Sequence, residues 1–310
     1  MNKADNDNDN DNDNRSTPLS YDKTKMEAKE ISIQGGASKS ILLNDSSSSK
    51  DALLGIRLVK GKSLLSVSNL LSPEEIEYVR QASIKAAARQ TLHNTHPEEQ
   101  GPDRLCVRMP TQLAASRHDI PDAGSQDLHD PLPLDLSHYV EERILQRTLR
   151  TIDEEFPDVR ETLFGGDCKS LVDLFVNDQL EWSTREPAIN VYYPPAGYFG
   201  IHKDNKALTI LMPLTSSCED DSDTTGMDLD STFTGGGTAF WSQSYPNEHR
   251  HAPSIVLKPN AGTALLWGGQ LSHKGLPIDK GMRVVFVASF SRKANPNQKA
   301  NNNTWVVSAR

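Results

Sequence analysis

The feature that most constrains the fold is a series of short β-rich runs that fills the sequence beyond residue 165. Each run is bounded by Gly, Pro, Asn or Asp, and turn residues at such short intervals favour strands over helices. The runs are KSLVDLFV, AINVYY, ALTILMPL, TAFW, SIVLK, TALLW and RVVFVASF. Several strands at this spacing predict a sandwich or barrel, with helices covering it.

One helix is signalled clearly ahead of these strands. Ser72 can cap it, Pro73 suits its first position, and Glu75 completes a capping box with Ser72. The stretch before it, GIRLVKGKSLLSVSNLL over residues 55–71, is predicted as one or two short strands.

A second helix is predicted from Ser137 to Phe156. Apolar residues at helical spacing line one face of this segment, and Pro157 ends it. Between the two helices, the residues from Leu92 to Leu134 are rich in His, Asp, Pro and Gln, which favours long loops.

These patterns indicate one folded domain over residues 56–293, with helical support over 56–165 and a β core over 166–293. Residues 1–55 open with an alternating Asn-Asp tract and hold few apolar groups to offset the entropy of ordering. They predict a disordered low-complexity tail. The Asn-rich residues 294–310 predict a second disordered tail.

Composition limits the classes of binding partner and the cellular compartment that we expect. The formal net charge is −9, and no Lys/Arg cluster is interleaved with aromatics, which argues against a nucleic-acid partner. No apolar run is typical of a secretory leader or a membrane span, so we expect a soluble intracellular protein of the cytoplasm or nucleus, without a membrane partner. Three widely spaced cysteines without a C-x-x-C predict reduced thiols.

A candidate metal site begins with His202 and Asp204. Side chains at i and i+2 of a strand point to the same face and can meet one ion, but the pair alone also fits two solvated side chains at a strand end. His273, which follows the predicted strand GTALLWGG, is a candidate third ligand. Two His and one carboxylate with open positions are the ligands of non-haem Fe(II) oxygenases, whereas an acid-rich site with backbone carbonyls suggests calcium.

Arg283 lies ten residues after His273, at the start of another predicted strand. If the intervening turn forms a hairpin, its guanidinium can point into the same cavity and hold a carboxylate through a bidentate pair. The alternative is an exposed arginine at a strand end.

Five motifs occur in one order along residues 56 to 293. They are LLSPEEIEYV, then YPPAGYFGIHKD from Tyr193 to Asp204, then GGGTAFW, PNAGTALLW, and a distal His followed about ten positions later by a basic residue. This order resembles the 2-oxoglutarate and Fe(II)-dependent dioxygenases of the prolyl 4-hydroxylase-like type. Ala196 departs from the pattern, because it replaces the first glycine of the second motif.

The resemblance implies a mainly β fold with α support (α+β), in which N-terminal helices pack on a double-stranded β-helix, or jelly roll. It implies that His202, Asp204 and His273 bind Fe(II) and take part in catalysis. By the same resemblance, Arg283 pairs with the far carboxylate of 2-oxoglutarate.

The resemblance also implies a hydrogen bond from Tyr193 to the 2-oxoglutarate carboxylate. Tyr192 is the neighbouring alternative, because the strand register at a Pro-Pro bulge is ambiguous. Thr209 occupies a matching inward position on the next strand and is a further candidate for co-substrate binding. For both tyrosines the alternative is core packing with a satisfied hydroxyl.

The implied activity is hydroxylation of a C–H bond with dioxygen and 2-oxoglutarate, releasing succinate and CO2, with ascorbate as a reductant. The implied substrate is a protein or peptide side chain, such as prolyl, or a small molecule. Two alternatives stay open: a non-catalytic jelly-roll binding module, and an oxidative demethylase acting on a small molecule or nucleic acid.

Two further segments carry weaker signals. His249 and His251 form a same-face pair in a polar loop, which fits either a cupin-like metal site or a solvated loop. The acidic stretch 219–230 lacks the ligands of an EF-hand and is interpreted as an inserted loop. Its negative charge, near the expected mouth of the barrel, could favour a basic peptide or cationic substrate.

Overall fold

The structure is a computed structural model of the 310-residue chain and describes residues 25–34, 38–41, 53–93, 106–117, 130–194, 198–218, 231–242 and 251–294. The helical segments are α1 Leu54–Val59, α2 Pro73–His93, α3 Gln112–Arg117, α4 Leu134–Tyr139, η5 Val140–Gln146, α5 Arg147–Glu155, α6 Pro157–Phe164 and α7 Leu171–Val176. The first strands are β1 Glu27–Ser32, β2 Ser38–Ile41, β3 Ser63–Ser68, β4 Cys106–Pro110, β5 Leu180–Trp182, β6 Ala188–Tyr192, β7 Phe199–His202 and β8 Leu208–Pro213. The later strands are β9 Ser216–Ser217, β10 Thr232–Gly235, β11 Thr238–Trp241, β12 Ile255–Leu257, β13 Ala264–Trp267, β14 Ser272–Gly275, β15 Ile278–Gly281 and β16 Arg283–Arg292.

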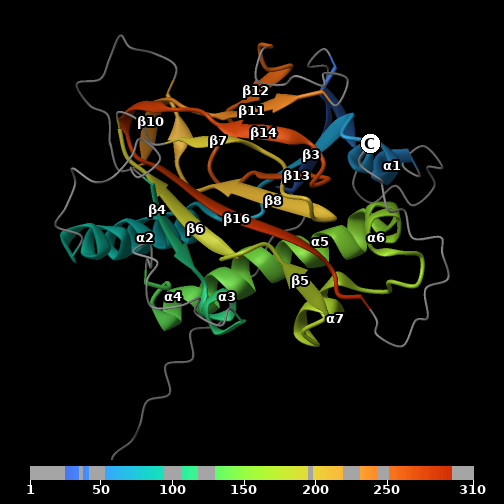
Figure 1. Cartoon of the computed structure of the whole chain (residues 1–310), viewed down its shortest axis with the longest axis horizontal. Coiled ribbons are helices and arrows are strands. Elements are labelled where there is room, and N and C mark those ends of the chain that lie inside the picture. The colour runs from blue at the N-terminus through green and yellow to red at the C-terminus, as the bar shows by residue number, and fades with distance from the viewer. Residues whose placement is uncertain are drawn as a thin grey trace, which may run out of the picture.

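Two antiparallel sheets lie one above the other (Figure 1). The larger has the order β2-β1-β3-β13-β8-β16-β6-β4, with β5 paired to β16, and the smaller has the order β12-β11-β14-β7. From β6 onward the chain passes repeatedly between them, so β6, β8, β13 and β16 lie in one sheet while β7, β11, β12 and β14 lie in the other. This is the arrangement of a double-sheet jelly roll, and it confirms the predicted mainly β fold with α support.

Strand β8, in the middle of the larger sheet, is buried on both faces, which explains why its sequence is almost entirely apolar. Leu208, Ile210 and Met212 pack in the main core with residues of the helices, and we call this side the helix face. Thr209 and Leu211 point to the other side, where Leu211 packs with residues of the smaller sheet. We call that side the pocket face.

The helix face is covered by α2 and by the continuous segment α4-η5-α5 (Figure 1). The predicted capping box of α2 is confirmed, because Glu75 N–H donates to Ser72 Oγ at 3.2 Å and Ser72 N–H donates to Glu75 Oε2 at 2.9 Å. The second predicted helix is also confirmed. It begins three residues earlier than expected, at Leu134, and contains a π-helical segment.

The N-terminal region differs from the expected tail over residues 1–55. β1 pairs along its whole length with β3, and β2 pairs with β1, which extends the larger sheet. Met26, Ala28 and Ile33 are buried. A few apolar residues suffice here because an existing strand supplies the hydrogen bonds, whereas the prediction rested on the average composition of the whole segment. Residues 54–59, expected in part as a strand, form α1.

The run KSLVDLFV was expected as a strand but forms helix α7. Ser170 caps the helix by accepting a hydrogen bond from Asp173 N–H at 3.0 Å. The Asp153 carboxylate, from α5, accepts hydrogen bonds from the N–H groups of Leu171 and Val172. These bonds satisfy the first backbone donors of the helix, and this tertiary cap decides between two structures that the short apolar run allows equally.

The segment from Leu92 to Leu134, expected as long loops, contributes an edge strand. β4 pairs antiparallel with β6, and α3 follows it. Residues 94–105 and 118–129 of this segment lie outside the described residues.

Other predictions fall where the structure gives no description. The acidic stretch 219–230, His249 and the C-terminal residues 295–310 lie outside the described residues. Among the described helices, none combines the length and the apolar character that crossing a membrane requires.

Candidate metal centre

His202, Asp204 and His273 converge between two adjacent strands. His202 ends β7 and lies directly opposite His273 on β14, and Asp204 follows two residues after His202. The distance from His202 Nε2 to Asp204 Oδ1 is 3.4 Å, and that from His273 Nε2 to Asp204 Oδ2 is 3.6 Å. One donor atom of each residue lies within 4.8 Å of the others, a spacing that one metal ion can bridge.

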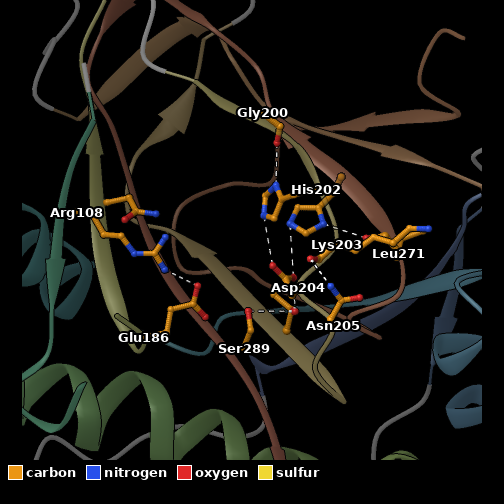
Figure 2. Close-up of polar contacts among 12 residues, drawn as sticks. Arg108, Glu186, Gly200, His202, Lys203, Asp204, Asn205, Leu271 and Ser289 are labelled. Atoms are coloured by element: carbon orange, nitrogen blue, oxygen red, sulfur yellow. Dashed lines mark hydrogen bonds and ion pairs between the residues drawn. The ribbon is translucent and has the colours of Figure 1, made fainter. Parts of the chain in front are cut away.

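Both imidazoles are held in the orientation that a metal ligand needs. His202 Nδ1 lies 2.8 Å from Gly200 O, and His273 Nδ1 lies 3.0 Å from Leu271 O (Figure 2). A carbonyl only accepts hydrogen bonds, so each Nδ1 carries a proton, and Nε2, which faces Asp204, is the nitrogen left for a metal. Each ring is therefore held in place by the carbonyl two residues earlier.

Asp204 is fixed from its other side by Thr209, whose Oγ1 donates to Oδ2 at 2.6 Å. Thr209 is thus placed beside the carboxylate of Asp204 on the pocket face. The side chains of Asp204 and His273 are only 8% and 7% exposed, whereas that of His202 is 35% exposed. The cluster is therefore open to solvent on the His202 side.

The protonation states of His273 and Asp204 suit a cation. Burial lowers the pKa of His273 below its ordinary value, which favours the neutral ring. Burial raises the pKa of Asp204, but hydrogen bonds from His202 and Thr209 and the nearby His273 outweigh that effect, so the net pKa is lowered and the carboxylate is ionised. For His202, burial lowers the pKa, and the hydrogen bonds to Asp204 and Gly200 raise it by more.

Arg283 begins β16 and lies in the same pocket, 4% exposed. The turn before it is not a simple hairpin, because β15 pairs with β10 and β16 belongs to the larger sheet. Its Nη2 donates to Thr238 Oγ1 at 2.8 Å, and its guanidinium carbon lies 5.5 Å from the centroid of the Tyr192 ring. Among the described residues, no carboxylate lies within salt-bridge distance of Arg283.

The two tyrosines lie on opposite faces of the sheet. Tyr192 is buried on the pocket face, opposite Arg283 in the strand register, and its hydroxyl accepts a hydrogen bond from Asn190 Nδ2 at 3.4 Å. Tyr193 is half-buried against the main core on the other face. The structure therefore brings Tyr192, the alternative, to the pocket and not Tyr193, which was expected first. Alternation along β6 decides this.

The pocket contains polar residues that the sequence patterns did not single out. Besides the residues above, its polar lining includes Arg108, Glu186, Asn190 and Thr238, and its apolar lining includes Phe199, Leu211, Trp267, Val285 and Val287. Asn190 could have been found from its position two residues before Tyr192. Arg108 carried no such signal, because its segment was interpreted as a loop.

The rival histidine pair gains no support. His251 is exposed, and its backbone carbonyl accepts a hydrogen bond from Trp241 Nε1 at 3.0 Å. Within the described part of the chain, the three residues above are the one group of His, Cys, Asp or Glu spaced to hold a metal ion.

Neither a protein-family model nor a curated protein matches this chain. Solved structures similar to it include a rice dioxygenase for auxin oxidation, 15% identical with a TM-score of 0.43 over 77% of this chain and 76% of that one. A 2OG-Fe(II) oxygenase family oxidoreductase from Burkholderia pseudomallei is 16% identical, with a TM-score of 0.42 over 84% and 97%. A prolyl-4-hydroxylase from Pseudomonas putida is 14% identical, with a TM-score of 0.37 over 79% and 99%.

Proposed function

We propose that this chain is an Fe(II)- and 2-oxoglutarate-dependent dioxygenase that hydroxylates a C–H bond. The observation that carries the proposal is the convergence of two parts in one pocket. The first is the His202, Asp204 and His273 cluster, and the second is Arg283, a buried guanidinium without a carboxylate partner among the described residues.

The donor set fits iron. Two imidazoles and one carboxylate form the ligand set of non-haem Fe(II) oxygenases, which leaves positions open for other ligands. Calcium and magnesium prefer oxygen donors, and Asp204 is the one carboxylate of this cluster. Zinc accepts the same three residues, so the metal cluster alone does not distinguish an oxygenase from a zinc site.

Arg283 makes that distinction. A buried charge is costly unless it is paired, so the guanidinium requires an anion in the pocket. A carboxylate is the anion that its planar fork binds best, and the Tyr192 ring and the Thr238 hydroxyl lie beside it. A dicarboxylate co-substrate that reaches from the metal to Arg283 accounts for both parts of the pocket.

The pocket residues position and shield the reacting groups. When bound, iron and 2-oxoglutarate supply the activation of dioxygen, and the overall reaction converts R–H, dioxygen and 2-oxoglutarate to R–OH, succinate and CO2. Thr209 orients the Asp204 carboxylate, and the carbonyls of Gly200 and Leu271 fix the two imidazoles. Leu211, Trp267, Val285 and Val287 give the pocket an apolar wall that excludes water. The substrate is a protein side chain, such as prolyl, or a small molecule.

The test is succinate formation from 2-oxoglutarate with Fe(II), ascorbate and air, without an added substrate. We expect slow turnover by the wild type, loss of turnover in Asp204→Ala and His273→Ala, and recovery of Arg283→Ala at high 2-oxoglutarate. Asp167→Ala removes an exposed carboxylate at the far end of β16 and serves as the control. A wild type that binds neither iron nor 2-oxoglutarate would refute the oxygenase and leave a jelly-roll binding module.

A further inference from the structure

A second pair of charged side chains lies in the pocket beside the metal cluster. Arg108 Nη2, from β4, donates to Glu186 Oε1 at 2.5 Å, although the two residues are 78 positions apart (Figure 2). Glu186 lies just before β6, and its side chain is 7% exposed. Both residues line the same pocket as His202, Asp204 and Arg283. Neither belongs to the metal cluster.

This pair is incompletely hydrogen-bonded. Glu186 Oε2, Arg108 Nε and the neighbouring Asn190 Oδ1 are buried, and none of them has a hydrogen-bond partner among the described residues. The Ser289 hydroxyl lies near enough to lower the pKa of the Glu186 carboxyl, but its geometry toward Oε2 is not that of a hydrogen bond. Two acceptors and one donor of residues that line the same pocket therefore lack a partner among the described residues.

An incomplete ion pair does not stabilise the fold by itself. Burying two charges costs more than their attraction returns unless the remaining donors and acceptors are also satisfied. The Arg57–Glu30 pair, which joins α1 to β1, is bidentate, with distances of 2.5 and 2.8 Å. The Arg108–Glu186 pair makes a single hydrogen bond. A ligand that hydrogen-bonds the remaining donor and acceptor atoms of this pair would offset the free-energy cost of burying it.

The charges of the pocket select the ligand. Arg108 and Arg283 balance Glu186 and Asp204, and bound Fe(II) and doubly charged 2-oxoglutarate balance each other. A cationic or anionic substrate would leave a net charge in a buried site, which is costly. A zwitterion adds no net charge, and it offers a hydrogen-bond donor to Glu186 and an acceptor to Arg108.

We infer that Arg108, Glu186 and Asn190 form a substrate subsite and that the substrate is a small zwitterion of the α-amino acid type. Its ammonium group binds Glu186 Oε2, and its carboxylate binds the guanidinium of Arg108. This inference rests on the proposed oxygenase function and names its substrate class. It favours a free amino acid over a residue within a peptide, because a peptide bond removes both charges.

The first experiment measures whether amino acids stimulate the oxygenase. The standard L-α-amino acids are added one by one to the wild-type enzyme with Fe(II), 2-oxoglutarate and air, and succinate is quantified. At least one is expected to accelerate turnover, and its N-acetyl and methyl-ester forms are expected to be at least about tenfold weaker, because each removes a charge-assisted hydrogen bond. Stimulation by capped prolyl peptides only, or by none of these compounds while basal turnover persists, overturns the inference alone. Absence of any turnover or 2-oxoglutarate binding overturns the proposed function as well.

The second experiment separates recognition from folding. The double variant Arg108→Met/Glu186→Leu replaces the pair with apolar groups, a change that is commonly neutral or stabilising for a buried pair. Binding of the stimulating amino acid is measured by calorimetry, without oxygen, on protein loaded with Fe(II) and 2-oxoglutarate. At least about a tenfold loss of affinity is expected. The matched double variant Arg57→Met/Glu30→Leu, at the other end of the sheet, is expected to bind normally.

If the double variant has a lowered Tm, Glu186→Gln is the second variant, because its amide keeps the shape and still accepts from Arg108. It is expected to lose affinity for the amino acid while a substrate analogue without the ammonium group binds equally to variant and wild type. Equal affinity of wild type and variants for the amino acid would show that the pair is only structural and would overturn the inference.

Discussion

The layer of helices that covers the helix face, here called the helical layer, and the pocket face bury arginines in different ways. Arg147 of α5 donates to both carboxylate oxygens of Glu75, at 2.7 and 2.8 Å, and to the carbonyl of Leu70 at 2.7 Å. Arg283, on the pocket face, donates to Thr238 and has no carboxylate partner among the described residues. The site of Arg147 is therefore complete within the folded chain, whereas that of Arg283 becomes complete only with a ligand.

The glutamates of the two regions show the same difference. Burial raises the pKa of Glu75, but hydrogen bonds from Arg147 and Ser72 outweigh it, so the net pKa is below the ordinary value. Burial also raises the pKa of Glu186, and the nearby Asp204 raises it further, so the opposing effects of Arg108 and Ser289 do not restore it. The surroundings of Glu75 therefore stabilise its ionised form, whereas those of Glu186 destabilise its ionised form.

The largest expected effect on stability comes from Arg147→Met. The substitution leaves Glu75 buried without its charged partner, so the free energy of unfolding should fall by about 3–5 kcal/mol. Urea denaturation followed by circular dichroism measures this loss. A change of only about 0.5 kcal/mol, as for an ordinary surface substitution, would mean that the pair is not a structural element of the layer.

The same replacement of an arginine on the pocket face, Arg283→Met, should weaken ligand binding and not the stability of the fold. It removes a buried charge that lacks a carboxylate partner, so stability without co-substrate should be unchanged or higher. Affinity for 2-oxoglutarate should fall about 100-fold or more, because two charge-assisted hydrogen bonds are lost. Calorimetry on Fe(II)-loaded protein without oxygen measures this affinity.

Arg292→Met is the matched control for that measurement. Arg292 ends the same strand, and its Nη1 donates to the exposed Asp167 at 2.8 Å. Its replacement should leave 2-oxoglutarate binding unchanged. Equal losses in the two variants would show that the effect of Arg283 is not specific to the pocket.

A smaller effect is expected from Thr209→Val, which keeps the shape of the side chain and removes its hydrogen bond to Asp204. Groups that orient a metal ligand typically contribute about 10–100-fold to metal affinity. We expect a loss of about tenfold in Fe(II) affinity, measured by metal titration. Thr151→Val, which removes a hydroxyl bonded to the Arg147 carbonyl in the helical layer, should not change it.

The smallest effect is a pH dependence of opposite sign for the two glutamates. Because the folded-state pKa of Glu75 is lowered, its contribution to stability is present above the ordinary value of 4.5 and is lost as the pH falls through the folded value. Because the folded-state pKa of Glu186 is raised, its ionised form costs stability above the folded value, and this cost disappears as the pH falls toward 4.5.

Urea denaturation over a pH series tests these signs. Glu75→Gln should be less stable than the wild type at neutral pH, and Glu186→Gln should be more stable, with both differences shrinking in acid. Two differences of the same sign would contradict the contrast between the two regions.

Local patterns were sufficient where neighbouring residues determine the structure. The capping box of Ser72 and Glu75 and the strand ALTILMPL depend on contacts within a few residues or on burial of both faces, and both were found as predicted. The His202 and Asp204 pair was identifiable for the same reason, because two alternate residues of one chain segment share a face. The roles of these residues in metal binding remain predictions.

The tertiary structure decided what depends on distant segments. Asp153 turned KSLVDLFV into a helix by capping it from another element, and the register of β6 placed Tyr192 rather than Tyr193 in the pocket. Arg108 reaches Glu186 only because β4 pairs with β6. The sequence by itself predicted a sandwich or barrel from its strand pattern, and its motifs, through the family resemblance, implied the jelly roll and the candidate ligands, since periodicity and motif spacing are local. Only the folded chain determined the subsite beside them, because pairing across 78 residues depends on sheet register, which no local pattern encodes.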